Sequence, residues 1–83
     1  MFYTYVLRSR KNNKIYKGHT KDLQNRLSQH NTENSKKKFS CINGPWELMF
    51  FETFNTRSEA MRYEKFLKTG KGREHIREKI AEL

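Results

Sequence analysis

The chain has 83 residues, and its 18 Lys or Arg residues against 9 Asp or Glu residues give a formal net charge of +9. This length predicts one small domain over residues 1–83 and leaves no room for a second. The sequence contains nothing like the roughly 20 consecutive apolar residues that span a bilayer. Its first residues also lack the long apolar core of a signal peptide, so we expect a cytoplasmic protein without membrane contact.

The excess of positive charge favours a polyanionic partner, most often a nucleic acid, over a merely soluble basic surface. Aromatic residues make up 13% of the chain, which argues against disorder. A single cysteine, Cys41, and three scattered histidines offer no zinc-ligand spacing. The run Lys36-Lys37-Lys38 lies in a polar stretch, residues 32–40, that is typical of a loop. Such a basic loop is either solvated or holds phosphate.

The first two predicted strands form an antiparallel hairpin. Aromatic and β-branched residues fill Phe2–Ser9, a turn with two Asn residues follows, and a short second strand covers Lys14–Gly18. If the loop has an even number of residues, the alternation of side chains along a strand places Tyr5 on the same face as Tyr16 and Gly18.

A helix is predicted from Thr20 to Asn31, with Thr20 as its N-cap. Leu23 and Leu27 form the buried stripe of this helix. His19, just before it, is expected in the connecting loop.

Arg26 and His30 fall at the lip of that buried stripe and point the same way. For Arg26 the alternative is a surface ion pair with Asp22, which lies four residues earlier. For His30 the alternative is an ordinary surface histidine at the end of a helix. The helical pattern by itself leaves both alternatives open.

The longest strand signal is Trp46–Phe54, and a second long helix is predicted over Arg57–Thr69. Thr56 and Glu59 have the spacing of a capping box at the start of this helix. Gly70 suits the C-terminal cap.

A final helix follows Gly72, with Ile76, Ile80 and Leu83 at i, i+4 and i+7. The element order is therefore β-β-α-β-α-α. It predicts an α+β fold, with a small, mainly antiparallel three-stranded sheet flanked by three helices.

Glu64 breaks the pattern of the second long helix. On a helical wheel it falls inside the apolar arc, between Ala60 and Met61, and not on the wet face. A buried lone carboxylate is expensive, so it should be paired, protonated or bound to a metal. One reading is a structural salt bridge, and the other is a ligand for Mg²⁺ or Mn²⁺, which prefer oxygen donors.

Five segments in this order and spacing resemble the GIY-YIG nuclease superfamily, in its small stand-alone bacterial form. They are Tyr3–Tyr5, Tyr16–Gly18, Asp22–Asn31, Gly44–Leu48 and Ser58–Glu64. The resemblance covers almost the whole chain, and it implies a GIY-YIG-like fold.

The chain departs from the family pattern in three places. Tyr3 and Thr4 stand where the first signature tripeptide has Gly and Ile, and Lys17 stands where the second has Ile. Phe39-Ser40 follows the first helix where small members often carry an aromatic residue and a threonine.

The resemblance implies metal-dependent hydrolysis of phosphodiester bonds in DNA. It assigns one divalent cation, Mg²⁺ or Mn²⁺, to Glu64, and it places Arg26 on the scissile phosphate. Tyr5 and Tyr16 would position or activate water, and which of them is the general base stays open. His30 would contact the phosphate or move a proton.

Four lysines are expected to bind the nucleic acid: Lys17, Lys36, Lys37 and Lys38. DNA is the expected substrate, with RNA left open. The alternative is a non-catalytic, basic nucleic-acid-binding module with a vestigial active site. A structural basic protein of a ribonucleoprotein particle is the third possibility.

Overall fold

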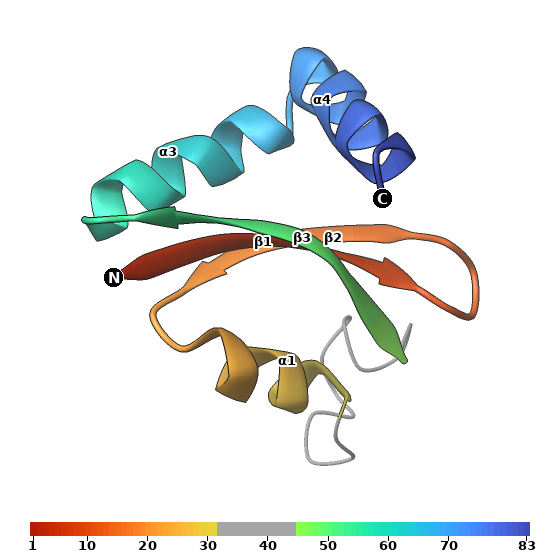
Figure 1. The fold of residues 1–83 in the computed structure, drawn as a ribbon, viewed down its shortest axis with the longest axis horizontal. Coiled ribbons are helices and arrows are strands. Elements are labelled where there is room, and N and C mark those ends of the chain that lie inside the picture. Colours follow the sequence, from red (N-terminus) through yellow and green to blue (C-terminus); the bar gives the residue numbers. More distant parts are fainter. Residues whose placement is uncertain (32–44) are drawn as a thin grey trace.

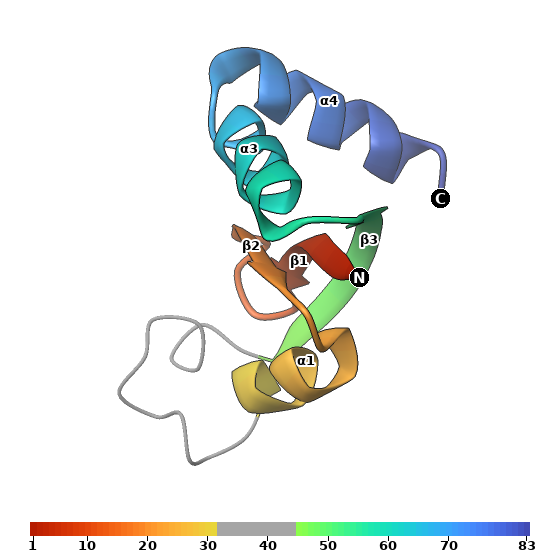
Figure 2. The ribbon, with the colours of Figure 1, turned by 90° about the vertical axis from the view of Figure 1, so that its left-hand side faces the viewer.

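The structure is a computed structural model that describes residues 1–31 and 45–83, and for residues 29–31 it describes the backbone only. Within these ranges a three-stranded antiparallel sheet carries one helix on one face and two on the other (Figure 1). Figure 2 shows the same layers after a quarter turn. The predicted α+β fold with the order β-β-α-β-α-α is confirmed. No helix of the described ranges has the length and apolar character to cross a membrane.

The central strand is β1 (Phe2–Ser9), which pairs with β2 (Ile15–Thr20) on one side and with β3 (Trp46–Phe54) on the other. β1 is buried over most of its length, in keeping with its aromatic and β-branched composition. β2 is an edge strand, since no second strand of the described ranges pairs with its outer side.

The hairpin register agrees with the alternation predicted from the sequence. Tyr5 lies opposite Gly18, which places both on the same face as Tyr16. His19 pairs with Thr4, because the ladder of β1 continues beyond the predicted end of the second strand. The prediction of a loop position for His19 is therefore wrong, and its side chain belongs to the opposite face from that of Gly18.

Helix α1 (Leu23–Asn31) begins three residues later than predicted. A carboxylate oxygen of Asp22 accepts a hydrogen bond from the backbone N–H of Asn25 at 3.1 Å, which makes Asp22 the capping residue. The Thr20 hydroxyl instead accepts from the backbone N–H of Asp22, also at 3.1 Å. Thr20 is still part of β2, so it shapes the turn into the helix and does not cap it.

Helix α3 (Arg57–Leu67) begins where the capping box predicts. The Thr56 hydroxyl accepts from the backbone N–H of Glu59 at 3.2 Å. The helix is tied to the central strand by the buried hydroxyl of Thr4, which donates to the carbonyl oxygen of Ala60 at 2.7 Å. This bond fixes α3 one turn before Glu64.

Helix α4 (Gly70–Ala81) begins at Gly70, which corrects the prediction of Gly70 as a C-cap. Thr69 is the N-cap of α4, since its hydroxyl accepts from the backbone N–H of Gly72 at 3.1 Å. A Cβ on Gly72 would collide with the carbonyl oxygen of Phe66. The two helices therefore meet in a tight corner that requires glycine.

Two small cores hold these layers together. The core under α3 and α4 buries Val6, Met49, Leu67 and Ile76. The core on the other face contains Tyr5, Leu7 and Trp46, with Leu23 and Leu27 of α1 packed against it. The predicted stripe of α1 thus faces the sheet, and the open edge of β2 lies between the two helical layers.

Candidate active site

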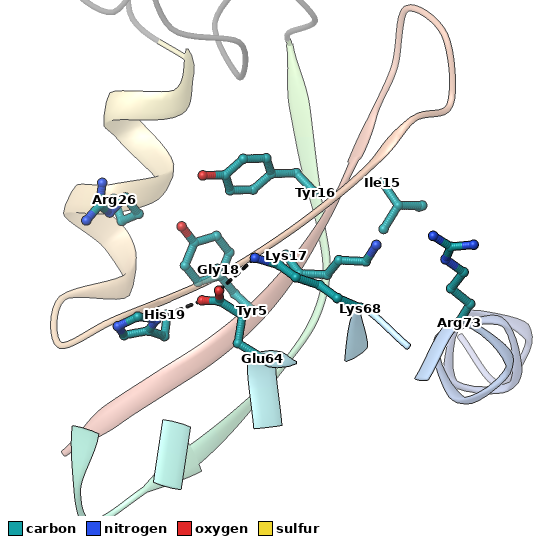
Figure 3. A pocket seen from close by; sticks show the side chains of 10 residues that line it. All are labelled: Tyr5, Ile15, Tyr16, Lys17, Gly18, His19, Arg26, Glu64, Lys68 and Arg73. Carbon is teal, nitrogen blue, oxygen red and sulfur yellow. Dashed lines mark hydrogen bonds and ion pairs between the residues drawn. The ribbon is translucent and has the colours of Figure 1, made fainter. Parts of the chain in front are cut away.

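A pocket of about 510 Å³ opens at the edge of the sheet, between α1 and the corner of α3 and α4 (Figure 3). Its lining consists of Tyr5, Ile15, Tyr16, Lys17, Gly18, His19, Arg26, Glu64, Lys68 and Arg73. Five of the predicted site residues are thus brought together: Tyr5, Tyr16, Lys17, Arg26 and Glu64. They come from the consecutive elements β1, β2 and α1 and from α3, which lies much later in the chain.

The two tyrosines lie next to one another on the face that α1 covers. Their ring centroids are 6.4 Å apart in a stacked arrangement. The ring of Tyr5 lies across Gly18, because a Cβ there would be 2.5 Å from the Tyr5 hydroxyl oxygen and 2.7 Å from its Cζ. Gly18 is therefore needed for the close approach of the Tyr5 side chain.

Burial raises the pKa of Tyr5 far above its usual range, and the neighbouring Tyr16 raises it further. The positive charge of Arg26 partly offsets this effect, while Glu64 adds to it. With these protein charges alone, Tyr5 is a neutral phenol at neutral pH. It can donate a hydrogen bond, but it is a poor proton acceptor.

Glu64 enters the pocket from α3 and is 18% exposed. One carboxylate oxygen lies 2.7 Å from Nδ1 of His19, and the other accepts a hydrogen bond from Nζ of Lys68 at 2.9 Å. Burial alone would raise the pKa of Glu64, but these two hydrogen bonds and the two nearby charges outweigh it and lower the pKa. Glu64 is therefore a carboxylate at neutral pH, and it is paired, not isolated.

Sequence reasoning missed both partners of Glu64. Lys68 lies four residues after Glu64 on the helix, a spacing that predicts an ion pair. His19 follows from the strand alternation once β2 is extended past Gly18. The same helical wheel placed Met61 at the border of the apolar arc, and this prediction is wrong, because Met61 is 44% exposed.

Positive charge dominates the pocket. Its cations are Lys17, Arg26, Lys68 and Arg73, against the single carboxylate of Glu64. Burial lowers the pKa of Lys17, and the charges of Arg73 and Lys68 lower it further. Clustered cations of this kind favour an anionic ligand. No ion pair found in the two described ranges joins Arg26 to Asp22, the predicted alternative.

Arg73 had no signal in the sequence, because its position depends on where α4 begins. The α3–α4 corner directs it toward Lys17 and the pocket (Figure 3). Arg26 and Arg73 stand at opposite ends of the pocket in this view. A chain of phosphates could contact both.

Several residues that the sequence predicts for the site are not among the described residues that line this pocket. His30 belongs to α1, but its side chain lies outside the described part, and so do Lys36, Lys37 and Lys38. Their predicted roles stay predictions. Tyr3 packs edge-on against Phe51 at 5.8 Å between ring centroids, and it is not among the residues that line the pocket.

The donor set fits a divalent cation that is shared with the ligand. Residues 1–31 and 45–83 contain no group of three or more His, Cys, Asp or Glu side chains able to hold a metal by themselves. Mg²⁺ is commonly bound through one or two carboxylates together with phosphate oxygens and water. A single ionised Glu64 beside a phosphate-attracting surface fits that mode, with Lys68 competing for the same oxygen.

Comparison with known proteins agrees with this geometry. The family model of the GIY-YIG catalytic domain matches residues 1–77. The UPF0213 protein YazA of Bacillus subtilis is 39% identical over 64 residues, which are 77% of this chain and 63% of that protein. The chain thus matches less than two thirds of the length of this relative.

A UPF0213 protein of Staphylococcus saprophyticus is 34% identical over 67 residues, which are 81% of this chain and 79% of that one. The solution NMR structure of a UPF0213 protein from Bacillus halodurans is similar with a TM-score of 0.54 and 30% identity, covering 92% of this chain and 82% of that one. The chain therefore belongs to the GIY-YIG catalytic domain family.

Proposed function

We propose that this protein is a metal-dependent endonuclease that hydrolyses phosphodiester bonds in DNA. The observation that carries the proposal is the pocket that joins an ionised Glu64 to Arg26, Tyr5 and Tyr16. Membership of a family of catalytic domains supports it. So does the surplus of cations around one carboxylate, which suits a polyanionic substrate.

In this proposal Arg26 binds the scissile phosphate. Its planar guanidinium offers two parallel hydrogen bonds to phosphate oxygens, and its fixed charge stabilises the charge that grows in the transition state. Arg26, on α1, is half-buried, so water screens its charge less than that of a fully exposed side chain. Lys17 and Arg73 would hold neighbouring phosphates.

The two tyrosines would arrange the attacking water. The raised pKa of Tyr5 makes its hydroxyl a donor, so we assign it the positioning of water or of a phosphate oxygen. Tyr16 presents a second hydroxyl to the same space (Figure 3). Gly18, which has no side chain, leaves the room that the Tyr5 ring needs beside Tyr16.

Glu64 would hold the divalent cation, and His19 would orient its carboxylate through the 2.7 Å contact. When bound, such a cation supplies Lewis-acid stabilisation of the phosphate and of the leaving oxygen. Lys68 would turn from Glu64 toward the substrate phosphate, since its side chain is 55% exposed and solvent leaves room for that turn.

The test is cleavage of a panel of DNA structures with Mg²⁺, with Mn²⁺ and with a chelator. Wild-type protein should cleave at least one of them only with metal, and Glu64→Gln should not. Glu78→Gln, an exposed change of the same kind on α4, is the matched control and should keep activity. Cleavage that survives in Glu64→Gln would reject the proposal.

One observation favours a second candidate, a non-catalytic DNA-binding module. Both oxygens of Glu64 already have polar partners, His19 at 2.7 Å and the ammonium group of Lys68 at 2.9 Å, as in a structural cluster. That candidate predicts salt-dependent DNA binding without cleavage under any metal. It also predicts that Glu64→Gln leaves DNA binding unchanged when divalent cations are present, whereas the nuclease proposal predicts weaker binding.

A further inference from the structure

A second cavity, of about 710 Å³, adjoins the candidate active site. The two share Ile15, Lys17 and Arg73, so they form one continuous depression along the edge of the sheet. In Figure 3, Ile15 and Arg73 mark the end of the first pocket that is farthest from Arg26. The second cavity has the size of ordinary ligand pockets, which are about 300–1,000 Å³.

The floor of this second cavity is apolar. It is formed by Ile15, Ile76 and Ile80. Ile76 is 4% exposed and belongs to the core under α3 and α4, while Ile15 and Ile80 pack against that core. The floor is thus a rigid patch of aliphatic side chains on two elements, β2 and α4. A phosphate alone would gain nothing from such a floor, because it is strongly hydrated.

The rim of the cavity is cationic. It carries Arg8, Lys17, Arg73 and Arg77. None of the ion pairs found in the described ranges involves any of these four side chains. An apolar floor with an uncompensated cationic rim suits a ligand that has a flat apolar part and a negative charge.

A nucleotide of a nucleic-acid strand has both of these parts. Its base can lie on the isoleucines, and its phosphates can reach the guanidinium groups on the rim. A base inside a continuous duplex is paired and stacked, and it reaches a protein pocket only after leaving the stack at a cost of a few kcal/mol. An unpaired nucleotide reaches it without that cost.

We infer that the cavity over Ile15, Ile76 and Ile80 holds an unpaired nucleotide next to the phosphate bound in the candidate active site. The inference rests on the proposed function only for the identity of that neighbouring phosphate. It assigns the substrate to a class, namely nucleic acid with a single-stranded nucleotide beside the reacting bond, such as a branch or a free strand. A continuous duplex fills the catalytic pocket alone.

The experiment measures binding in a chelator, so that no cleavage takes place. The probes are a continuous DNA duplex, the same duplex with a short single-stranded branch, and that branched duplex with abasic residues in the branch. Wild-type protein should bind the branch about fivefold or more tightly than the duplex, and the abasic branch should lose most of this preference.

Two charge reversals on α4 test the place of binding. Arg77→Glu changes the rim and should remove the preference for the branch. Lys71→Glu changes an exposed residue of the same helix that lines neither cavity, so it should weaken all probes alike and keep the preference. Ile80→Ala should reduce the difference between the branch and its abasic form, with a thermal melt to check the fold.

Equal binding of branch and duplex by wild-type protein would overturn the inference, as would equal effects of Arg77→Glu and Lys71→Glu. A free mononucleotide that binds as tightly as the branch would assign the cavity to free nucleotides and also overturn it. These results are independent of the nuclease proposal, because metal-dependent cleavage with the Glu64→Gln control tests that activity separately.

Discussion

The two sides of the edge strand β2 build the candidate site in different ways. On the α1 side, Tyr5 is 2% exposed and belongs to a packed apolar cluster. On the α3–α4 side, Glu64 and its partners are joined by hydrogen bonds and charge. The first side offers rigid hydroxyl groups, whereas the second offers charges that can exchange partners.

A chain of this size can thus build a candidate site without a large core. Packing energy fixes the tyrosines, because aromatic rings bury much area for few rotatable bonds. The charged side stays adaptable, since Lys68 is 55% exposed and a surface pair contributes little to stability. Gly18 is the point where the two sides meet.

The largest effect on cleavage is expected from removing the positive charge on the α1 side, that of Arg26. Arg26→Ala should lower metal-dependent cleavage roughly tenfold to a thousandfold, the loss of one transition-state contact of about 1.4–4 kcal/mol. Stability should change little, because Arg26 lies at the lip of the helix stripe and not in the core. Arg62→Ala, at an exposed arginine of α3 that lines neither this pocket nor the adjoining cavity, is the control. Wild-type turnover in Arg26→Ala would remove it from the site.

The next largest effect is expected at Gly18, where the two sides meet. Gly18→Ala places a Cβ 2.5 Å from the Tyr5 hydroxyl oxygen, and the buried ring has little room to move. We expect a loss of about 1–3 kcal/mol in the free energy of unfolding, together with reduced cleavage. In Gly70→Ala the added Cβ meets nothing within 4 Å, so it should be neutral or slightly stabilising. Denaturant unfolding of both variants measures the difference, and equal stability would contradict the packing argument.

The order of elements and the register of the hairpin could be predicted because both depend on local patterns. Strand alternation was enough to put Tyr5, Tyr16 and Gly18 on one face. The helix wheel was enough to find Glu64 beside Ala60, which is fully buried. Two of the three helix starts were wrong. Thr20 suits a cap but is held in β2 by strand pairing, whereas Gly70 suits the end of α3 but becomes the first residue of α4 because Thr69 caps that helix.

The missed part of the site lies on the charged side. His19 depends on how far β2 extends, and Arg73 depends on a corner that only the approach of Gly72 to Phe66 defines. Neither the end of β2 nor the geometry of the α3–α4 corner is encoded in a local sequence pattern. Apolar and aromatic positions have a periodicity that can be read, whereas the partners of a charge depend on where separate elements meet.

A smaller effect is expected in the salt dependence of DNA binding, which reports on the cations of the charged side. Duplex binding in a chelator should show a log–log salt slope steeper than about −2, because each phosphate contact contributes about −0.9. Lys17→Gln and Arg73→Gln should each reduce the magnitude of this slope by about 1. Lys11→Gln, in the exposed hairpin turn, should leave it nearly unchanged. A flat salt response of the wild-type protein would exclude a phosphate-binding surface.

The smallest effect concerns the pairing of Glu64 itself, measured by thermal melts without metal. Burial acts to raise the pKa of Glu64, but His19 and Lys68 lower it overall, so the folded protein binds this proton less tightly than the unfolded chain does. A carboxyl group of this kind contributes stability above its unfolded pKa of about 4.3, and the contribution is lost as the pH falls through the lower folded value. The difference in melting temperature between wild type and Glu64→Gln should therefore shift against the wild type as the pH falls below about 4.3. Glu78→Gln, an exposed change on α4, corrects for the general effect of removing a carboxylate. A shift in the opposite direction would mean that burial outweighs the two partners, and Glu64 would then belong with the packed side of the site.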